Sequence, residues 1–171
     1  MKKVPFLLLL ALLWAGCEYQ APLVTTPEIE MDRSVLGLWR KAGNDGPEEY
    51  LLVLPLNEHE YLVSYPARTA KAMFAKASLC RVAGRTLVQL QWFGTAQGRL
   101  PDDARVFQYA GYAVTDAGLT VRLLNSQVVS KDAASSAALT RAITAHRQDP
   151  NLFRADMVFQ KVQTDSAHAD G

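Results

Sequence analysis

Short apolar runs separated by turn residues occupy most of the chain after Ser34, and they limit its fold more than any other feature. The runs are rich in Val, Leu, Tyr and Phe, whereas Gly, Pro, Asn and Asp gather between them. This pattern is typical of β-strands joined by turns, because branched and aromatic side chains pack well on a pleated surface. It predicts seven strands in succession, over residues 35–41, 49–56, 59–66, 72–83, 86–93, 105–114 and 119–124.

The spacers between several runs are short enough to form hairpins. Asn57-Glu58, Ala83-Gly84-Arg85 and Asp116-Ala117-Gly118 each separate two apolar runs by two or three residues. Glycine in such a spacer permits the positive φ angles that tight turns require. We therefore expect consecutive strands to pair antiparallel, in a meander.

A helix is expected over residues 130–148, followed by a last strand over residues 153–162. Ser130 or Asp132 can cap its first turn, and Asp149-Pro150 ends it because the residue before proline avoids the helical region. The residues on its apolar face are Ala138, Leu139, Ala142, Ile143 and His146. Because this face is narrow and built mostly of alanine, we expect the helix to lie against the sheet or over a barrel mouth.

Together these elements predict a mainly β domain over residues 34–162, an antiparallel meander closed into a small barrel with one helix before the last strand. Closure removes the free strand edges at which chains aggregate. A β-sandwich is the competing architecture. The length of 171 residues fits one such domain with short appendages, and residues 163–171 are expected to form a flexible tail.

The start of the chain has the composition of a secretory signal peptide. Lys2 and Lys3 precede an apolar run over residues 4–14, and two small residues, Ala15-Gly16, follow it. The run is shorter than the roughly 20 apolar residues that span a bilayer as a helix. We therefore predict that residues 1–16 are a cleaved signal peptide rather than a permanent membrane anchor.

Ala15-Gly16-Cys17 resembles the lipobox of bacterial lipoproteins, although Trp14 stands where that family usually has leucine. The resemblance implies that Cys17 is the lipidated residue, acylated on its thiol and, after cleavage, on its new amino terminus. Glu18 in place of aspartate after the cysteine implies delivery to the outer membrane of the cell envelope, on its periplasmic face. The alternative is a plain secretory protein in which Cys17 is incidental.

Residues 17–33 are expected to be the lipidated N-terminus and a tether between the membrane and the domain. This stretch contains Pro22 and Pro27 and has no sustained periodicity. Several acyl chains would make the attachment permanent, since one chain alone holds a protein only reversibly.

Gly37-Leu38-Trp39 resembles the Gly-x-Trp signature of lipocalins and other calycins, whose elements also run as a β meander, a helix and a final strand. The resemblance implies a calycin-like barrel in which Trp39 plugs the closed end. It also implies that a basic residue late in the chain, Lys161 or Arg154, packs over the tryptophan. Lipocalins have eight strands before the helix, where this sequence shows seven.

No residue pattern indicates catalysis, and we predict that the chain is not an enzyme and binds no metal or cofactor. The three histidines fall on separate predicted elements without metal-ligand spacing: His59, His146 and His168. The acid pairs Glu48-Glu49 and Asp102-Asp103 lie in predicted loops, where carboxylates are solvated rather than tuned for proton transfer. Cys80 is expected to be a small buried apolar residue, and we assign it no chemistry.

The predicted barrel interior is the candidate for a binding role. Aromatic residues fall on most of the predicted strands, and closure turns about half of them inward. They can line a cavity for an apolar or amphipathic ligand, or they can fill the interior as an ordinary core, which is the favoured interpretation.

Charge excludes one class of partner and leaves others open. The chain has 18 basic and 17 acidic side chains and a net charge of +1, which is too little positive charge for nucleic-acid binding. A basic strip over residues 68–85 is interpreted as a solvated sheet face. We expect a membrane-anchored, non-catalytic envelope lipoprotein that acts as a binding or accessory module, or alternatively a structural or assembly lipoprotein that contacts another envelope protein.

Overall fold

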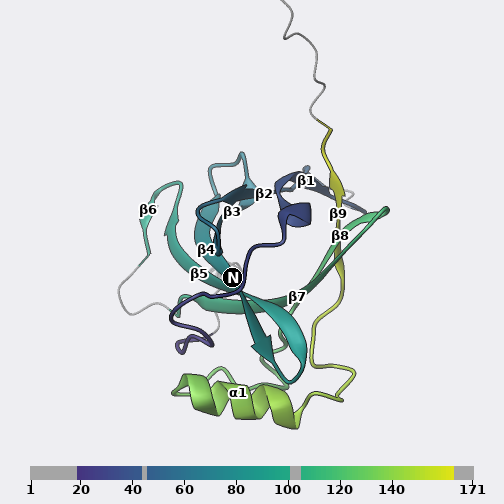
Figure 1. The fold of residues 1–171 in the computed structure, drawn as a ribbon. Helices are drawn as coiled ribbons and strands as arrows, with labels where there is room; N and C mark the ends of the chain where they lie inside the picture. The colour runs from purple at the N-terminus through teal and green to yellow at the C-terminus, as the bar shows by residue number, and fades with distance from the viewer. Residues whose placement is uncertain (1–18, 44–45, 101–104, 164–171) are drawn as a thin grey trace, which may run out of the picture.

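The computed structural model describes residues 19–43, 46–100 and 105–163. Within them, eight antiparallel strands close into a barrel, in which the last strand pairs with the first (Figure 1). The strands are β1 (Gly37–Lys41), β2 (Tyr50–Pro55), β3 (Glu60–Ala67), β4 (Met73–Val82), β5 (Arg85–Thr95), β7 (Phe107–Thr115), β8 (Gly118–Leu123) and β9 (Met157–Lys161). The prediction of a mainly β, calycin-like barrel is confirmed, and the sandwich alternative is wrong.

Each predicted strand corresponds to a barrel strand, with boundaries that differ by a few residues. The sequence does not reveal β6 (Gly98–Arg99), a two-residue strand that pairs with the end of β5. The expected last strand starts later than predicted, because Phe153 makes only an isolated bridge to Leu124 before β9 begins at Met157.

The predicted tight turns have the backbone geometry that their residues permit. Between β4 and β5, Ala83 and Gly84 both have positive φ, at 52° and 78°. Between β7 and β8, Gly118 has a φ of 132°, and a Cβ atom built on it would lie 2.1 Å from the carbonyl oxygen of Phe159. Only glycine therefore lets β8 approach β9 this closely.

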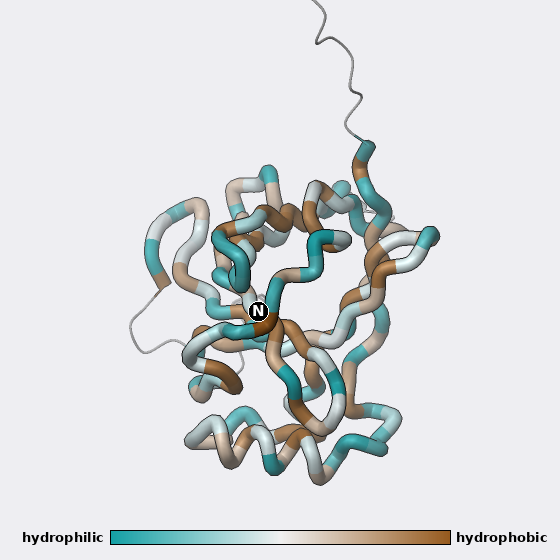
Figure 2. The backbone as a smooth tube through the Cα atoms, in the orientation of Figure 1, coloured by the Kyte–Doolittle hydropathy of each residue, from teal (hydrophilic) through white to brown (hydrophobic). Residues whose placement is uncertain are grey.

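Alternate side chains along the strands point into the barrel and form its inner core. Along the tube in Figure 2, hydrophilic and hydrophobic positions follow one another at short intervals. The buried residues of the inner core are Trp39, Val53, Tyr61, Val63, Ala75, Ala77, Leu79, Leu90, Trp92, Leu119 and Phe159. This period of two is the one that the β-type runs predict.

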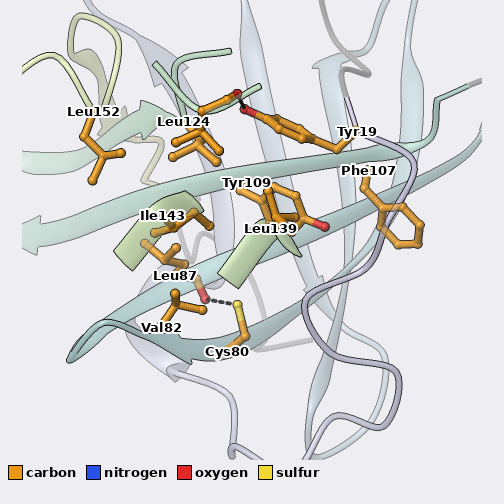
Figure 3. Packing of buried hydrophobic residues seen from close by; sticks show 11 residues of the cluster. Tyr19, Cys80, Val82, Leu87, Phe107, Tyr109, Leu124, Leu139, Ile143 and Leu152 are labelled. Carbon is orange, nitrogen blue, oxygen red and sulfur yellow. Dashed lines mark hydrogen bonds between the residues drawn. The ribbon is translucent and has the colours of Figure 1, made fainter. Parts of the chain in front are cut away.

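A second core, the outer core, lies outside the barrel, under helix α1 (Ser136–Ala145) (Figure 3). Leu139 and Ile143 from the helix pack against outward-facing side chains of β4, β5 and β7, including Leu87 and Tyr109. The expectation that the helix lies against the sheet is thus confirmed. The strands β4, β5 and β7 have a core on both faces, which explains their apolar composition.

The helix is shorter than its sequence pattern predicts. Its N-cap is Ser135, whose side chain accepts a hydrogen bond from the backbone N–H of Ala138. The predicted cap Asp132 instead pairs with Arg105 at 2.7 Å. At the other end the helix stops at Ala145, before the predicted Asp149-Pro150 stop, in a series of turns.

The N-terminal segment, expected to be a tether, lies on the barrel from Tyr19 onward. The backbone of Tyr19 exchanges two hydrogen bonds with Phe107 at the start of β7, at 3.1 and 3.0 Å. Further along, the buried amide of Gln89 accepts from the backbone N–H groups of Leu23 and Val24 and donates to the carbonyl of Val24. These contacts join positions about 65 to 90 residues apart, so no pattern among neighbouring residues predicts them.

The segment ends in the 3₁₀ helix η1 (Arg33–Val35), directly before β1. On the way, Met31 donates its backbone N–H to the carbonyl of Glu58 in the β2–β3 turn, at 3.0 Å. The partly buried side chains of Ile29, Met31, Val35 and Leu36 pack against the inner core. Residues 29–36 therefore close one end of the barrel.

The close approach at Gly118 predicts a large penalty for any side chain there. Gly118→Ala must displace the Phe159 carbonyl as well as accept a strained φ, whereas Gly84→Ala has no atom within 4 Å of its new Cβ. We expect Gly84→Ala to lower the free energy of unfolding by about 1–2 kcal/mol, and Gly118→Ala to cost about 1–3 kcal/mol more. Urea denaturation of both variants measures the difference, and equal losses would contradict the proposed contact.

Candidate functional site

Side chains fill most of the barrel interior but leave an apolar cavity of about 100 Å³. The residues that line it come from the segment before β1 and from six of the barrel strands: Val35, Leu51, Val53, Tyr61, Val63, Ala77, Leu79, Val88, Leu90, Ala110, Tyr112, Leu119 and Val121. The interior was interpreted either as a ligand cavity or as an ordinary filled core. It has features of both, since a packed core surrounds a small void.

The volume of the cavity limits what it can hold. Pockets for drug-sized ligands measure about 300–1,000 Å³, so the interior as it stands does not enclose a whole lipid or cofactor. An engineered apolar cavity of about 150 Å³ stays free of water and binds benzene. The cavity here is smaller, and it suits the end of an alkyl chain or a group of similar size.

Two tyrosines of the cavity wall bind Asp32, the N-cap of η1. The backbone N–H of Asp32 donates to the phenol oxygen of Tyr61 at 2.6 Å, and the Tyr112 hydroxyl donates to Asp32 Oδ2 at 3.0 Å. The other carboxylate oxygen, Oδ1, accepts the backbone N–H of Ser34 at 2.9 Å. The carboxylate of Asp32 thus fixes η1 and holds the Tyr112 phenol, while the backbone of the same residue holds the Tyr61 phenol.

The ionisation of these groups follows from their surroundings. Burial works to raise the pKa of Asp32, but hydrogen bonds from Ser34 and Tyr112 outweigh it, so the pKa lies below its usual 3.8. Burial, and then the hydrogen bond to Asp32, raise the pKa of Tyr112. The carboxylate is therefore charged and the phenol neutral at neutral pH, which is the pairing that the hydrogen bond needs.

Trp39 and Lys161 have the arrangement that the Gly-x-Trp resemblance implies. Trp39 is 2% exposed, and its ring Nε1–H donates to the carbonyl of Val35 at 2.8 Å. The Lys161 ammonium lies 5.1 Å from the centroid of the Trp39 ring, in cation–π range. Of the two candidates, Lys161 thus packs on the tryptophan, while the guanidinium of Arg154 donates to Ser126.

A second polar cluster lies between the ends of β1 and β3 and was not found in the sequence. Glu49, predicted to be solvated, accepts hydrogen bonds from Lys41 at 2.8 Å and from the Tyr65 hydroxyl. Burial, and then the hydrogen bond to Glu49, raise the pKa of Tyr65 to about 12. The Glu49 side chain is 35% exposed in these contacts, whereas the Glu48 side chain is 60% exposed and pairs with Arg40 at 3.3 Å, so the prediction of solvation fits Glu48 better than Glu49.

The two histidines within the described residues are not brought together. His59 and His146 lie apart, on the β2–β3 turn and at the end of α1. Among residues 19–43, 46–100 and 105–163, no group of three or more His, Cys, Asp and Glu side chains is placed to hold a metal. Cys17, Asp102-Asp103 and His168 lie outside the described residues.

Cys80 is a buried free thiol in the outer core, as predicted. Its Sγ lies 3.6 Å from the carbonyl oxygen of Leu87 (Figure 3). Burial raises the pKa of the thiol to about 11, so the nucleophilic thiolate form is scarce at neutral pH.

The basic residues of the 68–85 strip are spread along the barrel. Arg68 lies over the Tyr50 ring at 5.5 Å, Lys76 pairs with Glu60 at 3.2 Å, and Arg85 donates to the carbonyl of Arg147. Arg85 also borders an outer groove of about 380 Å³ with Arg122, Arg147 and Arg154. Each of these four guanidinium groups has an acceptor within this chain.

Comparisons with protein-family models, with curated proteins and with solved structures found no match to this chain. Within the described residues, no helix is long and apolar enough to cross a membrane. The barrel cavity, closed by η1 and the Asp32 contacts, is therefore the candidate site on structural grounds alone. In the sequence, the alternating apolar residues of the strands indicated the cavity. No pattern indicated the contacts of Asp32, because its two tyrosines are 29 and 80 residues away.

The role of Asp32 predicts a pH-dependent loss of stability. Asp32→Ala removes a helix cap, at about 0.5–2 kcal/mol, and the acceptor of Tyr112, at about 0.5–1.5 kcal/mol. Asp32→Asn keeps an acceptor for Ser34 and should lose less.

The sign of the pH effect follows from the lowered pKa of Asp32. The stabilisation by its carboxylate is complete above the unfolded-state pKa and is lost as the pH falls through the lower folded-state pKa. Urea denaturation at pH 7 and pH 3 should show that the gap between wild type and Asp32→Asn narrows in acid. A gap of equal size at both pH values would argue against the charged contact.

Proposed function

We propose that this chain is a lipid-anchored protein of the bacterial cell envelope whose barrel is a non-catalytic binding module for a small apolar group. The apolar cavity of about 100 Å³ is the observation that supports the binding role. The Ala15-Gly16-Cys17 sequence supports the anchor, with Cys17 as the acylated residue and the periplasmic face of the outer membrane as the location.

The chemistry of the cavity wall selects the ligand. Its lining is aliphatic apart from Tyr61 and Tyr112, whose hydroxyl groups are engaged by Asp32. A polar group placed there would lose its hydrogen bonds to water without replacement, whereas each buried CH₂ gains about 0.8 kcal/mol. The proposed ligand is therefore the alkyl end of an apolar or amphipathic molecule, and the wall offers it contact rather than a reaction.

A second candidate function is a structural or assembly lipoprotein that contacts another envelope protein. It is favoured by an apolar outer face on β1 to β4, which belongs to neither core: Leu38, Leu52, Leu54, Leu62 and Phe74. Leu54 is 40% exposed there. A single dominant protein adduct from a photo-crosslinker at Leu54 in cells would favour this function over the first.

The anchor predicts that membrane attachment depends on one sulfur atom. Cys17→Ser should move the protein from the membrane fraction to the soluble periplasmic fraction or leave it as uncleaved precursor, since no acyl chain can be attached. Cys80→Ser, which removes the other cysteine, is the matched control and should stay in the membrane fraction. Cleaved Cys17→Ser protein that remained embedded in membranes would refute the anchor.

The cavity predicts that a small apolar probe binds inside the barrel. Xenon should shift the methyl NMR signals of lining residues such as Val63 and Leu90. Ala110→Val fills part of the cavity and should weaken xenon binding by about tenfold, which corresponds to about two lost CH₂ contacts. Ala113→Val, on the exposed face of the same strand, should leave it unchanged.

The biological ligand is sought by native mass spectrometry of protein isolated from envelopes. A retained amphipathic molecule in wild type that is depleted in Ala110→Val supports the proposal. Wild-type protein with neither a retained molecule nor xenon-dependent shifts would contradict it.

A further inference from the structure

The first residue that the structure describes is fixed in the fold. Tyr19 is 1% exposed, and its backbone is hydrogen bonded in both directions to Phe107. Its hydroxyl donates to the carbonyl of Val129 at 3.0 Å, and its ring packs edge-on against Tyr109 with centroids 5.3 Å apart (Figure 3). Tyr19 therefore belongs to the outer core and does not move independently of the barrel.

Cys17 precedes Tyr19 by only two residues. Consecutive Cα atoms are about 3.8 Å apart, so the Cα of Cys17 lies within about 7.6 Å of the Cα of Tyr19 in any conformation. Acyl chains carried by Cys17 enter the bilayer at that point. A free tether over residues 17–33 would have let the barrel stand well clear of the lipid, but the contacts of Tyr19 remove that freedom.

The strand topology shows which end of the barrel lies close to Cys17. Tyr19 pairs with the start of β7, and β7 runs antiparallel to β1 through the intervening strands β8 and β9. The start of β7 and the start of β1 therefore lie at opposite ends of the barrel. Since η1 directly precedes β1, the end closed by η1 is the end remote from Cys17.

Phe93 is an exposed apolar side chain on the end that is held close to Cys17. It is 49% exposed on the outer face of β5. Its neighbour Trp92 donates a backbone hydrogen bond to Val106 at 2.8 Å, which places Phe93 beside the start of β7. Leu56, equally exposed at 48%, follows β2 at the η1 end.

The charges on this end are of both signs. Arg105 is paired with Asp132 at 2.7 Å, and Lys131 lies beside Asp132 in the chain. Contact with lipid here does not depend on anionic headgroups, so a zwitterionic bilayer is the appropriate partner to test.

We infer that the acylated protein lies directly on the phospholipid surface, with the β7-start end and Phe93 against the lipid and the η1 end facing away from it. This orientation rests on the proposed acylation of Cys17. It leaves the Asp32 contacts, and the end of the cavity that they close, on the side open to the periplasm.

The test compares two equally exposed positions on the acylated full-length protein in phosphatidylcholine vesicles. Phe93→Cys and Leu56→Cys each receive an environment-sensitive NBD label, because Cys80 is buried and Cys17 is blocked by lipid. With nitroxide-bearing lipids, quenching at position 93 should exceed quenching at position 56 by about twofold or more. Equal quenching, or stronger quenching at position 56, would overturn the orientation.

A linker variant tests whether the short connection is the cause. About 20 Gly/Ser residues inserted between Glu18 and Tyr19 span about 25 Å on average, so quenching at position 93 should fall to the level at position 56. Undiminished quenching would show that the short chain does not set the orientation. Unchanged thermal unfolding of the variant verifies that its barrel is intact.

The mass of the N-terminal peptide separates failure of this inference from failure of the anchor. If Cys17 carries no acyl chain, both the anchor and the orientation are refuted. If Cys17 is acylated and the two positions are quenched equally, the anchor stands and only the orientation is refuted.

Discussion

The hydrogen bonds between β9 and β1 join the two ends of the meander, and the other features of this structure depend on that closure. Trp39 pairs with Lys161 across this seam, so the same contact that completes the ring also places the lysine over the tryptophan. A closed ring of eight strands has an inside just wide enough for side chains. The inner core, its small void and the need for a closing segment at the end all follow.

The outer core packs on the outward face of strands whose inward face forms part of the inner core. Strands β4, β5 and β7 contribute side chains to the interior on one face and to the contacts of α1 and the N-terminal segment on the other. The short helix would be unstable alone, and residues 20–32 of the N-terminal segment form neither helix nor strand. Both are held by the outward faces of strands that the closed barrel already fixes.

Local patterns predicted what depends on neighbours in the sequence. The strand runs and the glycine-containing turns were predicted, because period-two alternation and the residues that permit a positive φ can be recognised within a few consecutive positions. The helix was predicted too long, since its flanks contain residues typical of helices while Ser135 supplies the actual cap. β6, with two residues, is too short to leave a pattern.

Long-range polar contacts could not be predicted from one sequence. Asp32 holds tyrosines from two distant strands, and Gln89 binds a segment about 65 residues earlier. Nothing near Asp32 distinguishes it from the other acids of the N-terminal segment. The lining of the cavity was predicted in kind, as apolar strand residues, but its volume depends on how the side chains pack in three dimensions.

The contacts of Gln89 have a practical consequence for anyone who expresses this domain. A fragment that starts at Ser34, where the strand pattern begins, would omit the backbone groups that satisfy both ends of this buried amide and would strip Tyr19 from the outer core. The cooperative folding unit therefore includes Tyr19, and the segment between Tyr19 and the first strand is an integral part of the domain.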